Sequence, residues 1–365
     1  MPVYLDHHAA TPLCAAARDA MRAAEETGWA NPSSLHGAGR AAKALLEGAR
    51  RAVAEAVGAA PADVVLTAGG TEACNLAVLG LPGTGPVVTT AGEHPAIGAA
   101  ARASGRPLRV LAMAGGAPGA EVVEEALGED GLLAVQWVSH ETGAILPVAE
   151  WVEAARAAGA RVVVDATQAL GRLPVDVEAL GADAIAFASH KIGGPAGAGA
   201  LWLRRGMELA PRALGGGQER GRRAGTPHAV TLAGFGAACG ALEARLGAME
   251  RVASWRDRLE ATLEALGGVV NGAEGPRVAS VTSASFRAWR GPVLVAALDV
   301  EGLQASAGAA CSSGVAEASP GLRALYPEEP WRAESALRLS LGPEGLDDAA
   351  IEEAVAILQR VIPRA

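Results

Sequence analysis

The chain is poor in cysteine and in aromatic residues: four of its 365 residues are cysteines, and aromatic side chains make up 3%. The cysteines lack Cys-x-x-Cys spacing, so we expect neither a metal site nor a disulfide framework. No apolar run approaches the roughly 20 residues that a membrane-spanning helix needs. The first residues, Met1 to Asp6, contain neither a basic nor an apolar segment, so we expect no export signal and a cytoplasmic protein.

Acidic residues outnumber basic ones, 40 to 31, and the formal net charge is −9. A surface of this sign argues against nucleic acid binding as the main function. The one basic cluster, Glu219 to Arg223, lies in a glycine-rich stretch at residues 215–227. This composition fits a solvated loop, a phosphate contact or a subunit contact, and the sequence alone leaves these alternatives open.

In the middle of the chain, short apolar segments alternate with alanine-rich ones. Hydrophobic residues make up 50% of the whole chain. This alternation is typical of a parallel sheet that is covered by helices on both faces. A helix is expected at residues 148–158, ended by Gly159. The expected strands are residues 64–67, 87–90, 132–138, 162–165, 184–188 and 199–203.

The last third of the chain has a different pattern. A long helical segment at residues 227–266 precedes short strands, and a helix at residues 347–361 closes the chain. The strands are expected at residues 278–286, 293–298, 306–310 and 337–341. We therefore expect an α/β protein with a large domain (residues 15–250), whose mostly parallel sheet is covered by helices. A smaller α+β domain would combine residues 1–14 and 251–365.

Lys191 and Asp165 form the most informative pair of residues. Lys191 leaves the apolar strand at 184–188 and enters a glycine-rich turn, and Asp165 ends the strand at 162–165. A lysine that can form a Schiff base and a carboxylate that can pair with a pyridinium nitrogen are the minimum equipment for holding pyridoxal phosphate. A strand-end aspartate alone is more often a helix cap, but adjacent βα units bring both residues to one edge of the sheet.

Two further strand ends carry candidate residues. Gly69, Gly70 and Thr71 open an expected helix, whose free N–H groups could bind an anion, although Thr71 could also be an ordinary cap. His94 follows the next strand and could stack on an aromatic cofactor and move protons. A hydrogen-bonded turn histidine is an equally ordinary interpretation of His94.

The smaller domain contributes Cys311 and Arg338. Cys311 lies among glycines and small residues at 306–314, so we expect a mobile, exposed loop that carries a candidate nucleophile. Without a nearby cofactor it would be a spectator thiol. Arg338 lies in an alternating strand pattern, where it is either a solvated edge charge or a two-pronged clamp for a carboxylate.

Together these motifs resemble those of the cysteine desulfurases of the NifS/IscS type, which are fold type I pyridoxal-phosphate enzymes of the class V aminotransferase group. The resemblance extends over nearly the whole chain and keeps the order of the motifs. The segments that carry it are LDHHAATP (5–12), NPSSLH (31–36), TAGGTEACN (67–75), GEHPA (92–96), HETGAILP (140–147), VDATQALGRLPVD (164–176), SHKIGGPAGAGAL (189–201), GGGQERGRRAGTP (215–227), SAGAACSSG (306–314) and LRLSLG (337–342).

The resemblance implies a role for each candidate by its position. Lys191 would bind the cofactor covalently, Asp165 would pair with its pyridine nitrogen, and His94 would stack on its ring. Gln168 would bind the phenolic oxygen of the cofactor, and Gly70 and Thr71, with Ser189 or His190, would bind its phosphate. Thr226 would reach the phosphate site of a neighbouring subunit in a homodimer. Arg338, helped by Asn31, would bind the substrate carboxylate, and Cys311 would attack the substrate sulfur.

The implied reaction converts L-cysteine to L-alanine and transfers the sulfur to Cys311 as a persulfide, for delivery to an acceptor protein. The segment from Cys311 to Leu322 is similar to the long loop of the IscS-like group. Iron–sulfur cluster biosynthesis, transfer RNA thiolation and cofactor biosynthesis all remain open as destinations. The alternatives with the same cofactor are a class V aminotransferase, a selenocysteine lyase and a cysteine β-lyase. The alternative to an enzyme is a non-catalytic binding or regulatory subunit of a sulfur-transfer assembly.

Three features depart from the family pattern. His140 replaces an asparagine that helps to hold the phenolic oxygen and the substrate, and we expect its imidazole to donate a hydrogen bond there. Ala188 stands where IscS-like relatives carry a phosphate-binding serine. The chain also ends at Ala365, without the extended tail that IscS-like members use for a scaffold partner, which leaves docking to such a partner open.

Overall fold

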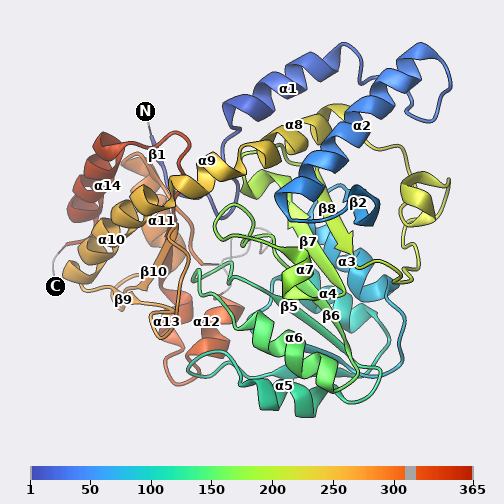
Figure 1. Cartoon of the computed structure of the whole chain (residues 1–365). Coiled ribbons are helices and arrows are strands. Elements are labelled where there is room, and N and C mark those ends of the chain that lie inside the picture. Colours follow the sequence, from blue (N-terminus) through green and yellow to red (C-terminus); the bar gives the residue numbers. More distant parts are fainter. Residues whose placement is uncertain (1, 309–317, 364–365) are drawn as a thin grey trace.

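The computed structural model describes residues 2–308 and 318–363, which form a larger lobe and a smaller lobe side by side (Figure 1). The larger lobe is built on a seven-stranded sheet with the order β2-β8-β7-β6-β5-β3-β4. Its strands are β2 (Val64–Thr67), β3 (Val87–Thr90), β4 (Leu108–Leu111), β5 (Leu132–Gln136), β6 (Arg161–Asp165), β7 (Ala184–Ala188) and β8 (Gly199–Leu203). Neighbouring strands are parallel except at β8, which is antiparallel to both β2 and β7.

All six strands expected in this lobe are confirmed, with ends that differ by at most two residues. β4 was not predicted, because its residues are only half-buried or exposed, and Arg109 interrupts the apolar pattern of this edge strand. Side chains alternate between the two faces of the sheet, as strand geometry requires. In β5, Leu132 and Ala134 pack in one core and Leu133 and Val135 in the other.

Helices cover both faces of the sheet. One face packs against α3 (Gly70–Gly80) and α4 (Pro95–Ala103), and the other against α2 (Gly37–Ala56), α6 (Val148–Ala157) and α8 (Ala229–Gly240). The remaining elements of this lobe are α1 (Ala15–Glu25), α5 (Ala120–Leu127), α7 (Val177–Leu180) and the 3₁₀ helices η1 (Pro61–Asp63), η2 (Ser189–Lys191) and η3 (Gln218–Gly221).

The smaller lobe contains a three-stranded antiparallel sheet with the order β12-β10-β9 and the parallel pair β1 and β11. Its strands are β1 (Val3–Tyr4), β9 (Val269–Val270), β10 (Val281–Ser285), β11 (Leu303–Gln304) and β12 (Ala336–Ser340). Its helices are α10 (Met249–Ala265), α11 (Gly291–Val300), α12 (Pro320–Leu325), α13 (Trp331–Glu334) and α14 (Asp348–Val361), and α9 (Leu242–Gly247) links it to α8. None of the helices in the described ranges combines the length and apolar character needed to cross a membrane.

Two expectations for this lobe were wrong. Residues 293–298 are not a strand but part of α11, which Pro292 opens and which buries Leu294 and Leu298 on one side. The apolar run has helical spacing at these two positions, a signal that the strand interpretation overlooked. The expected strand at 306–310 is reduced to a single bridge between Ser306 and Arg338, and its last two residues lie outside the described chain.

The hydrophobic cores support a division into two domains. We propose that residues 15–250 form the larger domain and that residues 1–14 and 251–365 form the smaller one. A separate core unites Val3 and Leu5 with side chains from α10 and α14. Met249 already belongs to this core, so packing of the smaller domain begins at the first residue of α10. The N-terminal segment thus packs with the C-terminal part of the chain (Figure 1).

Candidate active site

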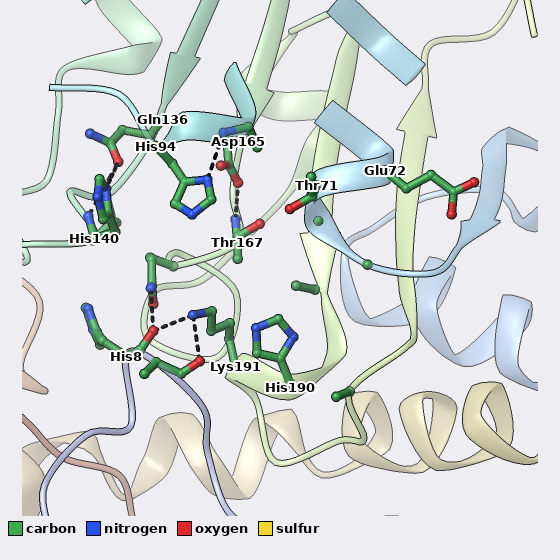
Figure 2. Close-up of a pocket in the computed structure, with 18 of the residues that line it drawn as sticks. His8, Thr71, Glu72, His94, Gln136, His140, Asp165, Thr167, His190 and Lys191 are labelled. Carbon is green, nitrogen blue, oxygen red and sulfur yellow. Dashed lines mark hydrogen bonds between the residues drawn. The ribbon is translucent and has the colours of Figure 1, made fainter. Parts of the chain in front are cut away.

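A cavity of about 520 Å³ opens at the carboxyl ends of the central strands, where ligands of such sheets bind (Figure 2). Most of its lining belongs to the larger lobe, and the N-terminal segment and β12 complete it. Among the lining residues are His8, Ala9, Gly69, Gly70, Thr71, His94, Gln136, His140, Asp165, Thr167, Gln168, Ala188, His190, Lys191 and Arg338. The cavity therefore brings together most of the residues that the sequence predicted.

Lys191 ends the short helix η2, directly after β7. Its Nζ donates hydrogen bonds to the carbonyl oxygens of His8 and Ala9, the latter at 2.9 Å (Figure 2). The same His8 carbonyl accepts a hydrogen bond from Gln168 Nε2 at 3.0 Å. The N-terminal segment thus orients both side chains, and the sequence offered no signal for this role of His8.

Asp165 ends β6, and its buried carboxylate accepts a hydrogen bond from the backbone N–H of Thr167 at 2.9 Å. The Cys74 thiol lies against Asp165, and burial and then this carboxylate raise the pKa of that thiol well above its usual value. Glu93, which is half-buried, accepts hydrogen bonds from Thr90 Oγ1 and from the N–H of Gln136, both at 2.7 Å. Burial raises the pKa of Glu93 to about 8.

The start of α3 provides an anion site beside these carboxylates. Gly69 is the N-cap, and no side chain of the described residues caps the helix, so its first N–H groups are open to a ligand. Gly70 is required there, because a Cβ would lie 2.7 Å from Thr167 Oγ1. Glu72 also lines the cavity, but its carboxylate extends toward Arg223 and pairs with it at 2.8 Å, so its charge is partly compensated (Figure 2).

His94 is held in one orientation as the N-cap of α4. Its Nδ1 accepts a hydrogen bond from the N–H of Ala96 at 3.1 Å, so in the neutral ring Nε2 carries the proton. The ring meets that of His140 edge-on, with centroids 5.2 Å apart at an angle of 81°.

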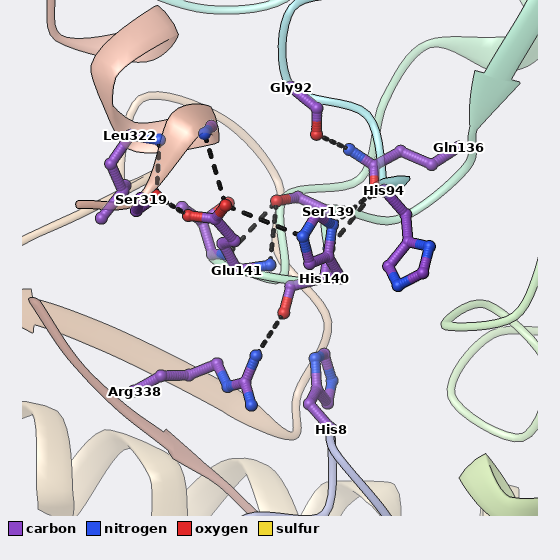
Figure 3. Close-up of polar contacts among 12 residues, drawn as sticks. His8, Gly92, His94, Gln136, Ser139, His140, Glu141, Ser319, Leu322 and Arg338 are labelled. Atoms are coloured by element: carbon purple, nitrogen blue, oxygen red, sulfur yellow. Dashed lines mark hydrogen bonds and ion pairs between the residues drawn. The ribbon is translucent and has the colours of Figure 1, made fainter. Parts of the chain in front are cut away.

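His140 lines the cavity, but both its ring nitrogens face protein groups (Figure 3). Gln136 donates its Nε2 hydrogen to the Gly92 carbonyl, so its Oε1 is left to accept from His140 Nδ1 at 3.0 Å. His140 Nε2 lies 3.7 Å from Glu141 Oε1. Burial, together with His94, Arg338 and Lys191, holds the pKa of His140 well below its usual value, so the ring is neutral. The expected hydrogen bond to a cofactor oxygen therefore competes with two existing contacts.

Glu141 joins the two lobes beside the cavity (Figure 3). Its carboxyl group accepts hydrogen bonds from Ser319 Oγ and, at 3.3 Å, from the N–H of Gly321. Ser319 in turn caps α12, where its Oγ accepts from the N–H of Leu322 at 2.9 Å. Burial raises the pKa of Glu141 above its usual value. The sequence did not predict this contact.

Arg338 extends from β12 to the cavity and is 2% exposed. Its Nη1 donates to the His140 carbonyl at 2.8 Å, and its Nη2 pairs with Asp6 Oδ1 at 2.7 Å. The alternative of a solvated edge charge is therefore wrong.

Four predicted residues lie elsewhere. Ser189 is buried with its Oγ directed at Gly194, without a hydrogen-bond partner in the described part of the chain, and Ala188 lines the cavity instead. Asn31 is exposed, and its Oδ1 accepts from the N–H of Ser33 at 2.9 Å. Thr226 is exposed on the glycine-rich loop. Cys311 lies outside the described residues.

Within residues 2–308 and 318–363, no group of three or more histidine, cysteine, aspartate or glutamate side chains could hold a metal ion. Of the residues that the sequence analysis missed, Glu93 and Gln136 had a usable signal. Glu93 directly precedes the candidate His94, and Gln136 is a polar residue at the end of an apolar strand.

Comparisons with known proteins identify relatives that cover nearly the whole chain. The family model for aminotransferase class V matches residues 3–345. An IscS-like cysteine desulfurase of Mycobacterium tuberculosis is 39% identical, over 99% of this chain and 96% of that protein. A cysteine desulfurase of Enterobacter agglomerans is 36% identical, over 88% of this chain and 84% of that protein. The solved structure of a NifS-like protein from Rickettsia africae has a TM-score of 0.89 at 25% identity and covers 99% of both chains.

Proposed function

The chain belongs to the aminotransferase class V family, and within it we propose that the protein is a cysteine desulfurase that uses pyridoxal phosphate. The observation that carries this proposal is the convergence of Lys191, Asp165 and Arg338 on one cavity. The chain has only two lysines, and the other, Lys43, is exposed on α2. The proposed reaction converts L-cysteine to L-alanine and yields sulfur for an acceptor.

The residues of the cavity fit pyridoxal phosphate. The open N-terminus of α3 and Thr71 suit its phosphate, and the buried Asp165 suits a protonated ring nitrogen. Gln168 Oε1 is buried without a hydrogen-bond partner among the described residues, which is costly unless a ligand supplies a donor. Ala188 adds no hydroxyl to the cavity, so Thr71, His190 and the backbone of α3 would carry the phosphate.

Bound pyridoxal phosphate would supply an electron sink that makes the α-proton of an amino acid removable. Lys191 would bind the cofactor covalently through Nζ. Once Nζ is released from the cofactor, it is placed to take up a proton and return it. Asp165 would keep a proton on the ring nitrogen. His94 would lie over the ring and offer a proton at Nε2, because Nδ1 is engaged by Ala96. Arg338 would hold the substrate carboxylate.

Sulfur transfer needs a thiolate, and we assign it to Cys311 from its sequence context. Burial raises the pKa of Cys74 and of Cys239 above the usual value, so both thiols stay protonated. Cys14 is used as the N-cap of α1. In the proposed step the Cys311 thiolate attacks the substrate sulfur. An S–S bond forms and the C–S bond breaks, and its electron pair stays with the carbon skeleton, which takes up a proton and leaves as L-alanine.

We also propose a homodimer in which Thr226 reaches the phosphate site of the neighbouring subunit. Thr226 is exposed and lies outside the cavity of its own chain. Its loop adjoins the segment of Asn31, because Pro32 and Ser33 line a second cavity of about 270 Å³ together with residues of that loop. Large apolar side chains near these segments in sequence are exposed: Trp29 by 75%, Leu35 by 91% and Leu214 by 85%. Sedimentation of the purified protein tests this assembly.

The function is tested with the purified protein and L-cysteine. We expect a visible absorption band that shifts when L-cysteine is added, with alanine and sulfide formed in the presence of dithiothreitol. Cys311→Ala should keep the spectral shift and lose both products, whereas the control Cys14→Ala should keep both. Sulfide with pyruvate from Cys311→Ala would instead identify a β-lyase. A cofactor-loaded protein that forms neither alanine nor sulfide would contradict the proposal.

A further inference from the structure

The carboxylate clamp of the cavity already holds a carboxylate of the protein itself. Arg338 Nη2 pairs with Asp6 Oδ1 at 2.7 Å, and Asp6 is the one acidic residue within ion-pair distance of Arg338 in the described chain. We propose that Asp6 determines how tightly the site binds the substrate carboxylate, as an internal competitor for Arg338. This inference rests on the proposed function, since it takes Arg338 as the substrate clamp.

The guanidinium has little freedom to escape this competition. It is buried, and its Nη1 is engaged by the His140 carbonyl at 2.8 Å. Its Nε is buried without a hydrogen-bond partner among residues 2–308 and 318–363. A substrate carboxylate can therefore add a contact to Arg338, but it must share the guanidinium with Asp6 or displace it.

The charge balance decides the sign of the effect. Arg338 and Asp6 form a neutral pair, so an incoming carboxylate meets a guanidinium whose charge is already compensated, and it lies close to a second negative charge. The other charged groups that act in this region are the cations Lys191 and Arg172 and the carboxyl of Glu141, whose pKa burial raises. Removing only the charge of Asp6 should therefore tighten carboxylate binding.

Asp6 has a structural reason to be present despite this cost. A buried guanidinium without a partner charge is strongly unfavourable, so Asp6 keeps Arg338 in place when no substrate is bound. Asp6 also lies on the same N-terminal segment as His8 and Ala9, whose carbonyl oxygens accept hydrogen bonds from Lys191. The same segment thus orients the lysine and the arginine.

The test measures binding of two ligands to the purified holoprotein by calorimetry. 3-Mercaptopropionate carries the substrate's thiol and carboxylate but has no amine, so it cannot displace Lys191, and 3-mercaptopropanamide is its uncharged counterpart. Asp6→Asn keeps the shape and a hydrogen-bond acceptor for Arg338 but removes the charge. The matched control is Glu260→Gln, because Glu260 pairs with Arg277 at 2.7 Å outside the cavity and its side chain is 17% exposed, against 18% for Asp6.

We expect Asp6→Asn to bind 3-mercaptopropionate about tenfold more tightly, which corresponds to about 1.4 kcal/mol. Binding of the amide should not change, and Glu260→Gln should bind both ligands as the unmodified protein does. The KM for L-cysteine should fall by a similar factor, with a smaller change in kcat. Such a split between KM and kcat is not expected from a residue that only supports the fold.

Equal or weaker carboxylate binding by Asp6→Asn would overturn the proposal, since Asp6 would then be only a support for Arg338. Unchanged binding by Arg338→Gln would also overturn it, because the carboxylate would then bind elsewhere. If the unmodified protein fails to convert L-cysteine, the proposed function is wrong, and the calorimetric comparison still decides the role of Asp6.

Discussion

The two sides of the cavity are built in different ways. On the cofactor side, Asp165 ends β6, Lys191 follows its neighbour β7, and α3 follows β2 of the same sheet, with β8 between β2 and β7. On the substrate side, Arg338 of β12 meets Asp6 and the His140 carbonyl, which lie far away in sequence and belong to different lobes. The strands and the helix of the cofactor side thus belong to the larger lobe, although His8 and Ala9 of the N-terminal segment accept hydrogen bonds from Lys191. The substrate side exists only where the lobes meet.

The two sides of the cavity should respond differently to ligands and to substitutions. A site on the ends of a packed sheet keeps its geometry without a ligand, because the strands are fixed by the core. A site between two lobes depends on their relative position, so it can respond to what binds there. Changes of the cofactor-binding residues Lys191 and Asp165 should therefore abolish chemistry, and changes on the substrate side should alter affinity and stability.

The largest effect is expected from Lys191→Ala. The variant should lose the covalently attached cofactor, and turnover of L-cysteine should fall by about 10³-fold or more, since both attachment and proton transfer are removed. Alanine formation and the visible spectrum measure this loss. Lys43→Ala removes the only other lysine and should leave both unchanged. Borohydride-trapped cofactor on a peptide containing Lys43 would contradict the assignment.

Glu93 should make the free energy of unfolding depend on pH. Its pKa is raised to about 8 by burial, so the folded state binds the proton more tightly than the unfolded state does. Its stabilising contribution is complete below its unfolded pKa and is lost as the pH rises to about 8, by at most about 1.4 kcal/mol per pH unit. Glu93→Gln should therefore gain stability relative to the unmodified protein between pH 5.5 and 7.5.

Chemical denaturation at several pH values measures this difference. Histidines of the site act in the opposite direction: burial and Lys191 lower the pKa of His190 to about 4, so its contribution is present at neutral pH and is lost on acidification. These contributions are common to both proteins and cancel in the comparison. A difference in stability that does not change with pH would show that Glu93 titrates normally.

Glu141→Ala tests the contact between the lobes. The variant leaves Ser319 and the N–H of Gly321 without their acceptor, and we expect a loss of about 1–3 kcal/mol in the free energy of unfolding. The loss should be local, so amide hydrogen exchange should accelerate in α12 more than in β6 and β7. Ser319→Ala should reproduce the faster exchange. Uniform acceleration across both lobes would mean that Glu141 supports the fold as a whole.

The same contrast explains how much of the site the sequence could predict. Lys191, Asp165, Thr71 and His94 were predicted because strand ends can be read from local apolar runs, and ends of parallel strands share one edge. The partners of Arg338 were not predicted, because nothing local links residue 338 to Asp6 or to His140. α11 was mistaken for a strand because residues 293–298 form a continuous apolar run, in which the helical spacing of Leu294 and Leu298 was overlooked.

The smallest effect is expected at Tyr4, which reports on the charge of the substrate side alone. Burial and then the Asp6 carboxylate raise the pKa of the Tyr4 phenol, whereas Arg338 lowers it. Asp6→Asn should therefore lower the pKa of Tyr4, and Glu93→Gln on the cofactor side should leave it unchanged. The chain has two tyrosines, so Tyr326→Phe leaves Tyr4 as the only phenol to follow by ultraviolet absorbance. A shift of the Tyr4 pKa caused by Glu93→Gln as well would mean that the two sides of the cavity are electrostatically coupled. The distinction between a cofactor side on the sheet and a substrate side between the lobes would then hold for their geometry but not for their charge.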